Sequence, residues 1–428
     1  MEELTRLIRE DMKPALGVTE PGAIAFAVAS AKKYTSGEVK HIRVALNSGM
    51  YKNAFNCGIP GSSRFGNLYE SALGAVAADP QKGLESLDGI SRADDEKAAQ
   101  MVEQGIVEAV LDHIGSEITI DAVVETETDT CAVHIRGSHT NIVEIEKNGT
   151  CIWSAGQEQK SLPEDQKTEE EPLIHRYSVH EILDYVRRVP IGEIDFIREA
   201  FSMNLELLEE GLESGRAVIA AQLLKENGGE KISNDTLKTA QLLCNGAIEA
   251  RVLGLSRPAM SITGSGAHGI IATMPLYACW QVEGAGEETL LRAAALSYLI
   301  TMYIKEYSGR LSAFCGCGIA AGTGMACGLA FMRGADEEAI ERVIRNMASG
   351  LTGMICDGGN HGCAMKGIVA VDAAFRSVDL ALQKISIEAI HGINGKTPED
   401  TMRYMGLIAS PGMTGTEKTI VDIMEQKN

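Results

Sequence analysis

The sequence has no excess of basic residues: 39 Lys and Arg stand against 59 Asp and Glu in 428 residues, which gives a formal net charge of −20 at pH 7. Because a nucleic-acid backbone binds positively charged surfaces, this balance argues against nucleic acid as a partner. The sequence also lacks a signal peptide, since residues 1–16 have the spacing of an ordinary amphipathic helix. The two absences together predict a cytoplasmic protein.

Long uncharged runs are nearly absent as well. Residues 311–332 form one that is long enough to suggest a membrane helix. Its cysteines, glycines, serine and threonine make it a poor insertion sequence, and no second span accompanies it. The composition fits a helix buried closely among others, so the sequence predicts no membrane association.

A compact cysteine framework is the third absence. The ten cysteines are scattered, which argues against disulfides and leaves reduced thiols or metal ligands. The most distinctive ones lie in two glycine-rich segments, residues 310–318 and 353–366. Each of them, taken alone, is equally compatible with a buried core cysteine. A structural zinc site fits less well, because its cysteines are usually about two to four residues apart.

The second segment has six residues between Cys356 and Cys363, and three of the six are glycines. Such glycines let backbone amides approach a bulky inorganic centre and donate to its sulfurs. With Cys315 or Cys317 of the first segment as a third thiolate, the set would hold an iron–sulfur cluster in which one iron has no protein ligand. That open iron would be the place where chemistry occurs.

Secondary-structure patterns change along the chain and predict an α+β protein. Residues 1–172 are predicted to be a mixed α/β domain with a small sheet, whose strands are concentrated in residues 117–153. Its end, residues 157–172, is acidic and nearly free of large apolar side chains, which is typical of a linker or exposed loop. Residues 173–428 have helical periodicity and are predicted to be a mainly α-helical cluster-binding domain, in which Ser178-Val-His-Glu181 is a capping box.

Some individual elements are also predicted. Helical spacing indicates helices over residues 93–113, 313–332 and 398–426. In the turn before the Ala-rich helix that runs to about Lys33, Thr19 is the expected N-cap.

A second glycine loop, Ser261-Ile-Thr-Gly-Ser-Gly-Ala-His-Gly269, lies between two predicted helices. Its amides and hydroxyls offer donors in a tight curve, which suits a carboxylate or a phosphate. An ordinary turn between helices is the alternative, because Gly and Ser are common in turns. His268 within this loop is likewise either a satisfied structural histidine or a catalytic one.

At these residues the chain resembles the L-cysteine desulfidase family, which is related to the iron–sulfur L-serine dehydratases. The resemblance spans nearly the whole chain. It is carried by Gly17 to Pro21, Lys52-Asn53, Ile59-Pro60-Gly61, His139-Thr-Asn-Ile142, Gly264-Ser-Gly266 with Gly269-Ile270, Arg310-Leu-Ser-Ala313 with Cys315, and Met354-Ile-Cys-Asp-Gly358 with Cys363-Ala-Met-Lys366.

The resemblance implies a [4Fe-4S] cluster bound by Cys315, Cys356 and Cys363, with Cys317 as a neighbour. It implies β-elimination from cysteine or serine, giving a 2-oxo acid, ammonia and sulfide or water, with the open iron as a Lewis acid. Polar residues of the glycine loop and of the first domain would hold the substrate, namely Thr19, Lys52, Asn53, His139, Thr140, Asn141, Gly264, Ser265 and Gly266. The expected partners are a small amino acid and, if the protein is a homodimer, a second copy of the chain.

The chain also departs from the family pattern around this pocket. Where the family has Gly-Cys-Thr-Glu-Pro, with the cysteine thought to be the base, this chain has Val18. Its glycine loop lacks two amide side chains of the family pattern, and residues 62–70 are bulkier and more charged. His268 and Glu20 are the candidates for the missing base.

These departures leave a second hypothesis open, a catalytically altered paralogue that binds a cluster or a small ligand without cysteine desulfidase activity. A third is a pyridoxal-phosphate enzyme that uses Lys366 or another lysine, with the glycine loop around the phosphate. No lysine stands out as a Schiff-base former, which disfavours the third hypothesis.

Overall fold

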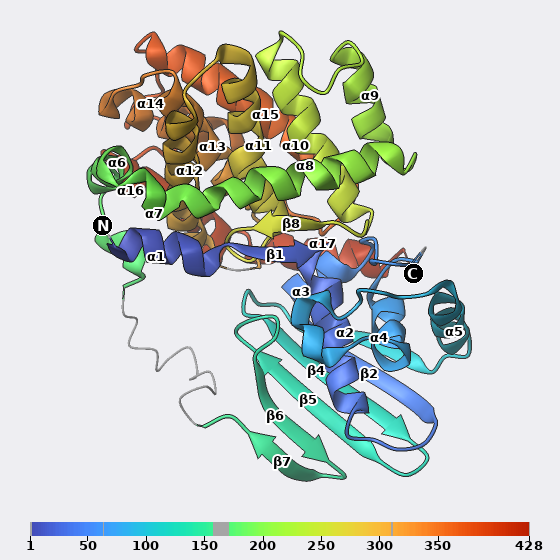
Figure 1. Ribbon diagram of the computed structural model, residues 1–428. Coiled ribbons are helices and arrows are strands. Elements are labelled where there is room, and N and C mark those ends of the chain that lie inside the picture. Colours follow the sequence, from blue (N-terminus) through green and yellow to red (C-terminus); the bar gives the residue numbers. More distant parts are fainter. Residues whose placement is uncertain (1, 63, 157–170, 310, 428) are drawn as a thin grey trace.

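The computed structural model describes residues 2–62, 64–156, 171–309 and 311–427, and it confirms the α+β fold class (Figure 1). The acidic stretch predicted to be a linker, residues 157–172, lies outside the described residues except for its last two. Two bodies make up the molecule. We call them the sheet body and the helical body.

The sheet body contains a six-stranded mixed sheet, drawn at the bottom of Figure 1. The spatial order is β3-β2-β4-β5-β6-β7; β2 and β3 are parallel, and every other neighbouring pair is antiparallel. The strands are β2 (Val39–Asn47), β3 (Val107–His113), β4 (Thr119–Thr126), β5 (Thr130–Arg136), β6 (Ile142–Lys147) and β7 (Thr150–Ser154). Buried and more exposed side chains alternate along β4, so one face of the sheet packs inward.

Helices cover that inward face. The N-terminal helices are α2 (Thr19–Lys32), α3 (Ser48–Ala54), α4 (Asn67–Val76) and α5 (Arg92–Glu103), with the 3-10 helix η1 (Pro80–Glu85). Helix α2 packs on β4 and β5 and is buried along nearly its whole length. Its Ile24 and Val28 share one apolar core with Ile120, Val124 and Val133 of the sheet. Each such buried side chain contributes about 1.5–3 kcal/mol to folding.

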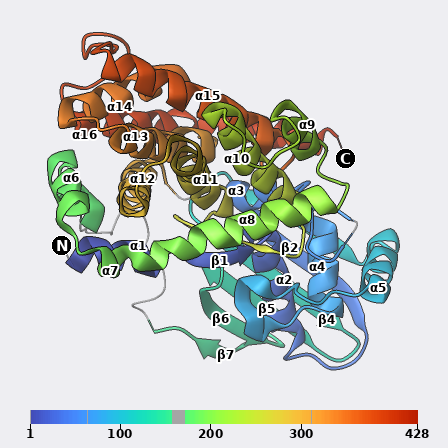
Figure 2. The ribbon, with the colours of Figure 1, turned by 45° about the horizontal axis from the view of Figure 1, so that its top comes forward.

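The helical body is built around α10, α11, α12, α13 and α15, which pack against one another (Figure 2). Its elements are η3 (Leu173–Arg176), α6 (Val179–Arg188), α7 (Ile191–Ile194), η4 (Asp195–Ile197), α8 (Arg198–Glu213), α9 (Val218–Glu226), α10 (Thr236–Val252), α11 (Gly266–Glu283), α12 (Glu287–Ser308), the π-helix η5 (Cys317–Ala321), α13 (Gly322–Met332), α14 (Glu337–Leu351), α15 (Gly362–Leu382), α16 (Pro398–Leu407), the π-helix η6 (Ile408–Gly412) and α17 (Thr414–Glu425). The capping box is confirmed: Ser178 and Glu181 close the N-terminus of α6 reciprocally.

Each end of the chain packs against the opposite body. The N-terminal end packs against the helical body, and the C-terminal end packs against the sheet body. Leu4 and Ile8 of α1 (Glu2–Asp11) belong to the helical core, and β1 (Lys13–Leu16) pairs antiparallel with β8 (Pro258–Ser261). At the other end, α17 contacts α3, and its Val421 belongs to the sheet core. The exchanged ends tie the bodies together. The domain limits 1–172 and 173–428 stay a prediction.

Three predicted helices differ from the structure. The helix predicted over residues 93–113 is wrong in its second half, because α5 ends at Glu103 and β3 begins at Val107. Gly105, with φ of 70°, ends the helix, and β3 pairs with β2, a partner that local periodicity does not reveal. The helix predicted over 313–332 begins at Gly322, after the π-helix η5. The one predicted over 398–426 is divided by Pro411, which has no N–H to donate.

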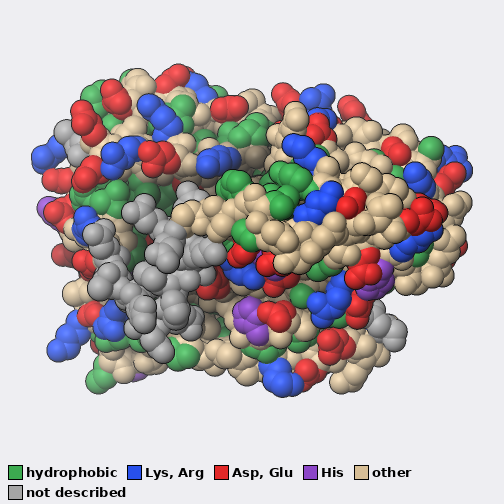
Figure 3. Space-filling model, turned by 90° about the horizontal axis from the view of Figure 1, so that it is seen from below, with side chains coloured by type: hydrophobic (Ala, Val, Ile, Leu, Met, Phe, Trp, Pro, Cys, Tyr) green, Lys and Arg blue, Asp and Glu red, His purple; other side chains and the backbone are tan. Residues whose placement is uncertain are grey.

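Two observations concern the surface and the uncharged run. Acidic and basic side chains are interspersed over the face seen in Figure 3. No helix in the described ranges is long and apolar enough to cross a bilayer. Within the run, residues 322–330 of α13 are buried in the helical core, as its composition predicts.

Candidate active site

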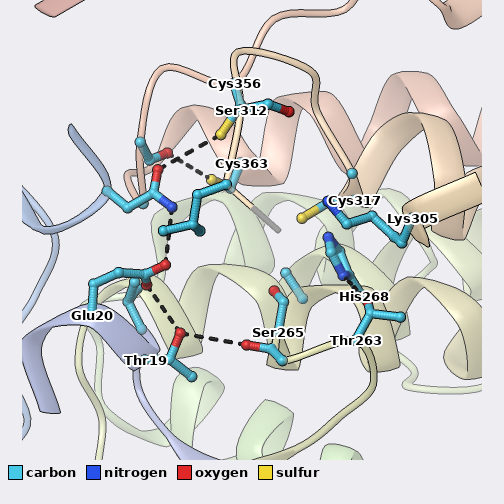
Figure 4. Close-up of a pocket in the computed structure, with 18 of the residues that line it drawn as sticks. Thr19, Glu20, Thr263, Ser265, His268, Lys305, Ser312, Cys317, Cys356 and Cys363 are labelled. Atoms are coloured by element: carbon cyan, nitrogen blue, oxygen red, sulfur yellow. Dashed lines mark hydrogen bonds between the residues drawn. The ribbon is translucent and has the colours of Figure 1, made fainter. Parts of the chain in front are cut away.

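A cavity of about 90 Å³ lies where the sheet body and the helical body meet. One buried water needs roughly 15 Å³ of such space, so the cavity has room for a ligand of about six waters' size. Segments that are far apart in sequence form its walls: the start of α2, α3, the turn after β5, the end of α10, the glycine loop before α11 and both cysteine-bearing loops. Figure 4 shows the side chains that face it.

The two cysteine-bearing loops are joined by backbone hydrogen bonds. The amide of Cys315 donates to the carbonyl oxygen of Met354 at 3.0 Å, and the amide of Cys356 donates to that of Ala313 at 2.6 Å. The residues in between form an antiparallel bridge. Because both strands of this short ladder carry a cysteine, the ladder fixes the two thiols relative to each other.

Cys363 completes this side of the cavity from the first turn of α15. The loop that leads to it passes close to the sheet body at Gly358, whose φ is 98°. A Cβ at this position would lie 2.4 Å from the carbonyl oxygen of Lys52, so only glycine fits. In Figure 4, Cys356 and Cys363 lie close together, with Cys317 across from them.

The four thiols act on one another electrostatically. A hydrogen bond from Cys317 lowers the pKa of Cys315 to about 7, although burial opposes this, and the N–H of Gly318 lies 3.4 Å from its sulfur. The same bond raises the pKa of Cys317 well above its usual value, with burial, Cys356 and Cys363 adding to the effect. Burial raises the pKa of Cys363 to about 11. We call this set of thiols, with its loops, the thiol side.

The described residues of the thiol side do not have the grouping of a single-ion site. Over the part of the chain that the structure describes, no three His, Cys, Asp or Glu side chains are grouped so that they could hold one metal ion. A cluster distributes its thiolates over several irons, so it needs thiols arranged around a space. The positive charges of Lys305 and Lys366 act on the same thiols, which suits an anionic cluster. Cys317 lines the cavity, whereas Cys315 is buried behind it.

A carboxylate dominates the opposite side of the cavity, which we call the acid side. Glu20 accepts hydrogen bonds from the Thr19 hydroxyl and the Asn53 amide, both at 3.0 Å, and His139 Nε2 lies 3.7 Å from its Oε1. Burial alone would raise the pKa of Glu20, but His139, Asn53 and Arg251 outweigh it and lower the pKa to about 2. Glu20 is therefore a fixed negative charge at neutral pH.

His268 lies between the two sides. Its Nδ1 is 2.5 Å from the hydroxyl of Thr263, and the side chain is buried. Burial, reinforced by the charges of Lys305 and Arg251, lowers the pKa of His268 well below its usual value, so the ring is neutral at physiological pH. On its other edge, a Cβ at Gly316 would lie 2.5 Å from Nε2, and glycine is what lets the cysteine loop come this close.

Val18 occupies the position at which the resembled family has its cysteine. It lines the cavity and packs with Cys57, Val252 and Cys363. Cys57 is not among the residues that line the cavity. Burial and the neighbouring charge of Glu70 raise its pKa well above the usual value, so its thiol keeps its proton. Cys57 therefore does not supply an ionised thiol in place of the missing cysteine.

Several predicted substrate-binding residues lie outside the cavity. Lys52 is fully buried, and its Nζ contacts Glu417 Oε2 at 2.7 Å and the carbonyl oxygen of Ser312 at 3.0 Å. It thereby joins α3 to α17 and to the first cysteine-bearing loop. Thr140 and Asn141 lie in the turn after β5, away from the cavity lining.

The remaining predicted residues divide in the same way. Cys315 and Gly266 adjoin the cavity without lining it. Those that do line it are Thr19, Glu20, Asn53, His139, Gly264, Ser265, His268, Cys356 and Cys363. The prediction that Thr19 is the N-cap of α2 is wrong. Val18 holds that position, and the Thr19 hydroxyl donates to Glu20 instead.

Arg251 is a cavity residue that sequence analysis missed. It lies at the C-terminal end of α10, a helix whose side chains are buried from Thr239 to Val252. Only 5% of Arg251 is exposed. A charged residue in a long buried helical stretch is a signal that could have found it, because buried charges are rare unless they have a partner.

Comparisons with known proteins show which family the chain belongs to. The profile of the family described as serine dehydratase alpha chain matches residues 81–422. A "UPF0597 protein" of Clostridium botulinum is 41% identical over 98% of both chains. One from Caldanaerobacter subterraneus is 35% identical over 99% of this chain and 98% of its own, and one from Clostridium tetani is 33% identical over 98% and 97%. The chain belongs to the serine dehydratase alpha-chain family.

Proposed function

We propose that the protein is an iron–sulfur-dependent lyase that catalyses β-elimination from a small amino acid, with serine or cysteine as substrate. The observation that carries this proposal is the meeting of three thiols, a fixed carboxylate and a neutral imidazole around one small cavity, with the thiol of Cys315 buried behind it. Loss of the Cα proton and of the β-hydroxyl or β-thiol gives aminoacrylate together with water from serine or hydrogen sulfide from cysteine. Hydrolysis of aminoacrylate then gives a 2-oxo acid and ammonia, so no oxidant or reductant is needed.

A [4Fe-4S] cluster would be held by Cys356 and Cys363 together with Cys315 or Cys317. When bound, it supplies a Lewis-acidic iron that assists departure of the leaving group. The chain's own contribution on this side is electrostatic. Lys305 and Lys366 offset negative charge on the thiol side, as their effects on these thiols indicate.

Removal of the Cα proton needs a base, and His268 is the residue that the surroundings favour. A neutral imidazole is the form that accepts a proton, and the contact of Nδ1 with Thr263 leaves Nε2 for this role. A pKa of about 2 makes Glu20 a weak base, and the lowered pKa of His268 weakens that base in the same direction, so the free Nε2 is what favours His268. The carboxylate of Glu20 keeps its charge at neutral pH, which suits ligand binding instead.

The test is anaerobic purification followed by an ultraviolet–visible spectrum, iron and sulfide analysis, and an assay of pyruvate and ammonia from L-serine and L-cysteine. We expect the broad visible absorption of an iron–sulfur cluster, about four irons per chain as a [4Fe-4S] cluster requires, and pyruvate formation that is lost in air. A pyridoxal-phosphate spectrum, or pyruvate formation at the same rate after the iron is removed, would contradict the proposal.

A second candidate is a catalytically altered paralogue that binds the cluster without cysteine desulfidase activity. The observation favouring it is Val18, which lines the cavity at the position of the family's base and cannot move a proton. Full cluster content without turnover of either amino acid would select this candidate.

We further propose that the protein works in the cytoplasm and forms a homodimer. All ten cysteines lie in the described ranges and are free of disulfides, which fits a reducing compartment and so supports the first proposal. Light scattering coupled to size-exclusion chromatography tests the second, and a monomeric mass for the cluster-loaded protein would contradict it.

A further inference from the structure

Arg251 is a buried cation without a partner. The side chain is 95% buried, it lines the cavity, and its Nε is shielded from solvent with no hydrogen-bond partner. Across the described ranges of the chain, Arg251 forms no ion pair at all. This differs from Lys52, a fully buried cation near the cavity, which is bonded to Glu417.

A buried guanidinium in this state is physically incomplete. Taking a charge out of water costs far more than folding can tolerate unless an opposite charge or several hydrogen bonds compensate. Arg keeps its charge at any physiological pH, so it cannot escape by losing a proton. An anionic ligand in the cavity would provide the compensation, and a carboxylate matches the planar fork of the guanidinium in two parallel hydrogen bonds.

Glu20 supplies the opposite charge in the same cavity. Thr19 and Asn53 use two of the roughly four acceptor positions of its carboxylate, so others remain for a ligand. The charges of Glu20 and Arg251 act on each other, yet no ion pair joins them. The cavity thus offers one cationic and one anionic group that are near but separate.

We infer that Arg251 binds the α-carboxylate of the substrate and Glu20 binds its α-ammonium group, so that the cavity selects zwitterionic α-amino acids and rejects 2-hydroxy acids. This inference rests on the proposed function for the identity of the ligand as substrate. Arg251 and Glu20 are positioning residues in this scheme, because they hold the amino acid without taking part in bond breaking. A cavity of about 90 Å³ limits the side chain to a few atoms.

The glycine loop explains how Arg251 reaches the cavity. A Cβ at Gly266 would lie 2.8 Å from the Arg251 Nε and 2.9 Å from the Cβ of Ala259. Glycine at this position therefore leaves room for the guanidinium beneath the loop. Residues 264 and 265 of the same loop line the cavity beside it, so their polar groups adjoin the site inferred for the carboxylate.

The experiment measures binding of L-alanine, which has both charged groups but no leaving group, to the anaerobically reconstituted protein by isothermal titration calorimetry. L-lactate and L-alaninamide each lack one of the two charges. We expect L-alanine to bind, and both analogues to bind at least about tenfold more weakly, since each leaves one buried charge of the protein unpaired.

The variants separate the two contacts. Arg251→Gln should weaken L-alanine binding roughly tenfold to a hundredfold and leave the weak binding of L-alaninamide unchanged. Glu20→Gln should weaken L-alanine binding to a similar degree and leave the weak binding of L-lactate unchanged. Arg257→Gln is the matched control, because Arg257 is exposed and pairs with Glu206 outside the cavity lining. Arg251→Lys, which keeps the charge but not the fork, should bind L-alanine with intermediate affinity.

Each outcome decides a different point. Equal binding of L-alanine by wild type and Arg251→Gln, or equal binding of L-lactate and L-alanine by wild type, overturns the inference. If Arg251→Gln does not fold, the comparison of the three ligands on wild type and Arg251→Lys still decides it. Binding that follows the expected pattern in a protein that makes no pyruvate would keep the inference and reject the proposed lyase activity. Turnover with a KM that does not depend on Arg251 would keep the proposed lyase activity and reject the inference.

Discussion

The thiol side and the acid side of the cavity differ in almost every physical respect. The thiol side belongs to the helical body and offers sulfur ligands and backbone amides, with two lysines whose charges act on the thiols. The acid side belongs largely to the sheet body and offers a carboxylate, an amide and an imidazole. Soft thiolates suit iron, whereas hard oxygen and nitrogen groups suit a charged organic ligand.

Under the proposed function, this difference amounts to a division of labour that neither body could perform alone. The cofactor would lie on the thiol side and the substrate on the acid side, and the proposed chemistry needs both within one small space. The exchanged ends of the chain and the buried Lys52–Glu417 pair hold the two bodies in this arrangement. Variants that disable one side or separate the two should therefore fail in distinguishable ways.

The largest effect is expected from disabling the thiol side alone. Cys356→Ser should remove the iron and abolish cluster-dependent activity, while the helical core, most of whose side chains lie outside the thiol side, stays folded. Iron analysis beside far-ultraviolet circular dichroism measures both. Cys151→Ser, at an exposed cysteine of β7, is the control and should keep its iron. Full iron content in Cys356→Ser would exclude Cys356 as a ligand.

Separating the two sides should cost the next largest amount. Lys52→Met leaves the carboxylate of Glu417 buried without its partner, and we expect a loss of about 3–5 kcal/mol in the free energy of unfolding. Chemical denaturation measures this. Lys40→Met, which removes an exposed lysine with surface ion pairs in the same body, should change the free energy of unfolding far less, because solvent screens such pairs. Adding Glu417→Met to Lys52→Met should restore stability, and a further loss would argue against the pair.

The buried charge of the acid side should make the free energy of unfolding depend on pH. The pKa of Glu20 is about 2 in the folded protein against an ordinary value of 4.5. A lowered pKa stabilises the fold above pH 4.5, and this contribution disappears as the pH falls from 4.5 towards 2. Wild type should therefore lose roughly 3 kcal/mol more than Glu20→Gln over that interval. Parallel stability curves for the two proteins would show that Glu20 is not held as a buried carboxylate.

The smallest effect is expected from a substitution of Val18, which lies at the boundary between the two sides. If the valine marks a lost base, Val18→Cys should raise sulfide release from cysteine at least about 10²-fold, or about 2.7 kcal/mol of barrier, and His268→Ala should change little. If His268 is the replacement, His268→Ala should abolish turnover and Val18→Cys should not help.

A matched control for this pair is Val252→Cys. Val252 packs with Val18 in the same small cluster but is not part of the cavity lining. It should leave the rate unchanged in either case. If wild type already releases sulfide at an ordinary enzymatic rate and all three variants match it, the base lies elsewhere.

Local sequence patterns predicted the elements that depend on neighbouring residues. The capping box at Ser178 and the burial of α13 follow from short-range spacing and composition, and both are confirmed. Patterns failed where a distant partner decides. Residues 107–113 have helical spacing, yet parallel pairing with β2 makes them a strand. Such non-local pairing leaves no periodic signal of its own.

The sequence by itself determined the chemistry that is available: the cysteines, the glycines that let loops approach closely, Glu20, and the valine at position 18. Only the tertiary structure decided which of these groups meet. It turned Lys52 from a predicted substrate ligand into a buried link between the bodies, and it brought Arg251 from the end of a buried helix to the cavity. The physical reason is that burial and charge pairing are properties of contacts between distant segments, and these contacts exist only after the two bodies pack together.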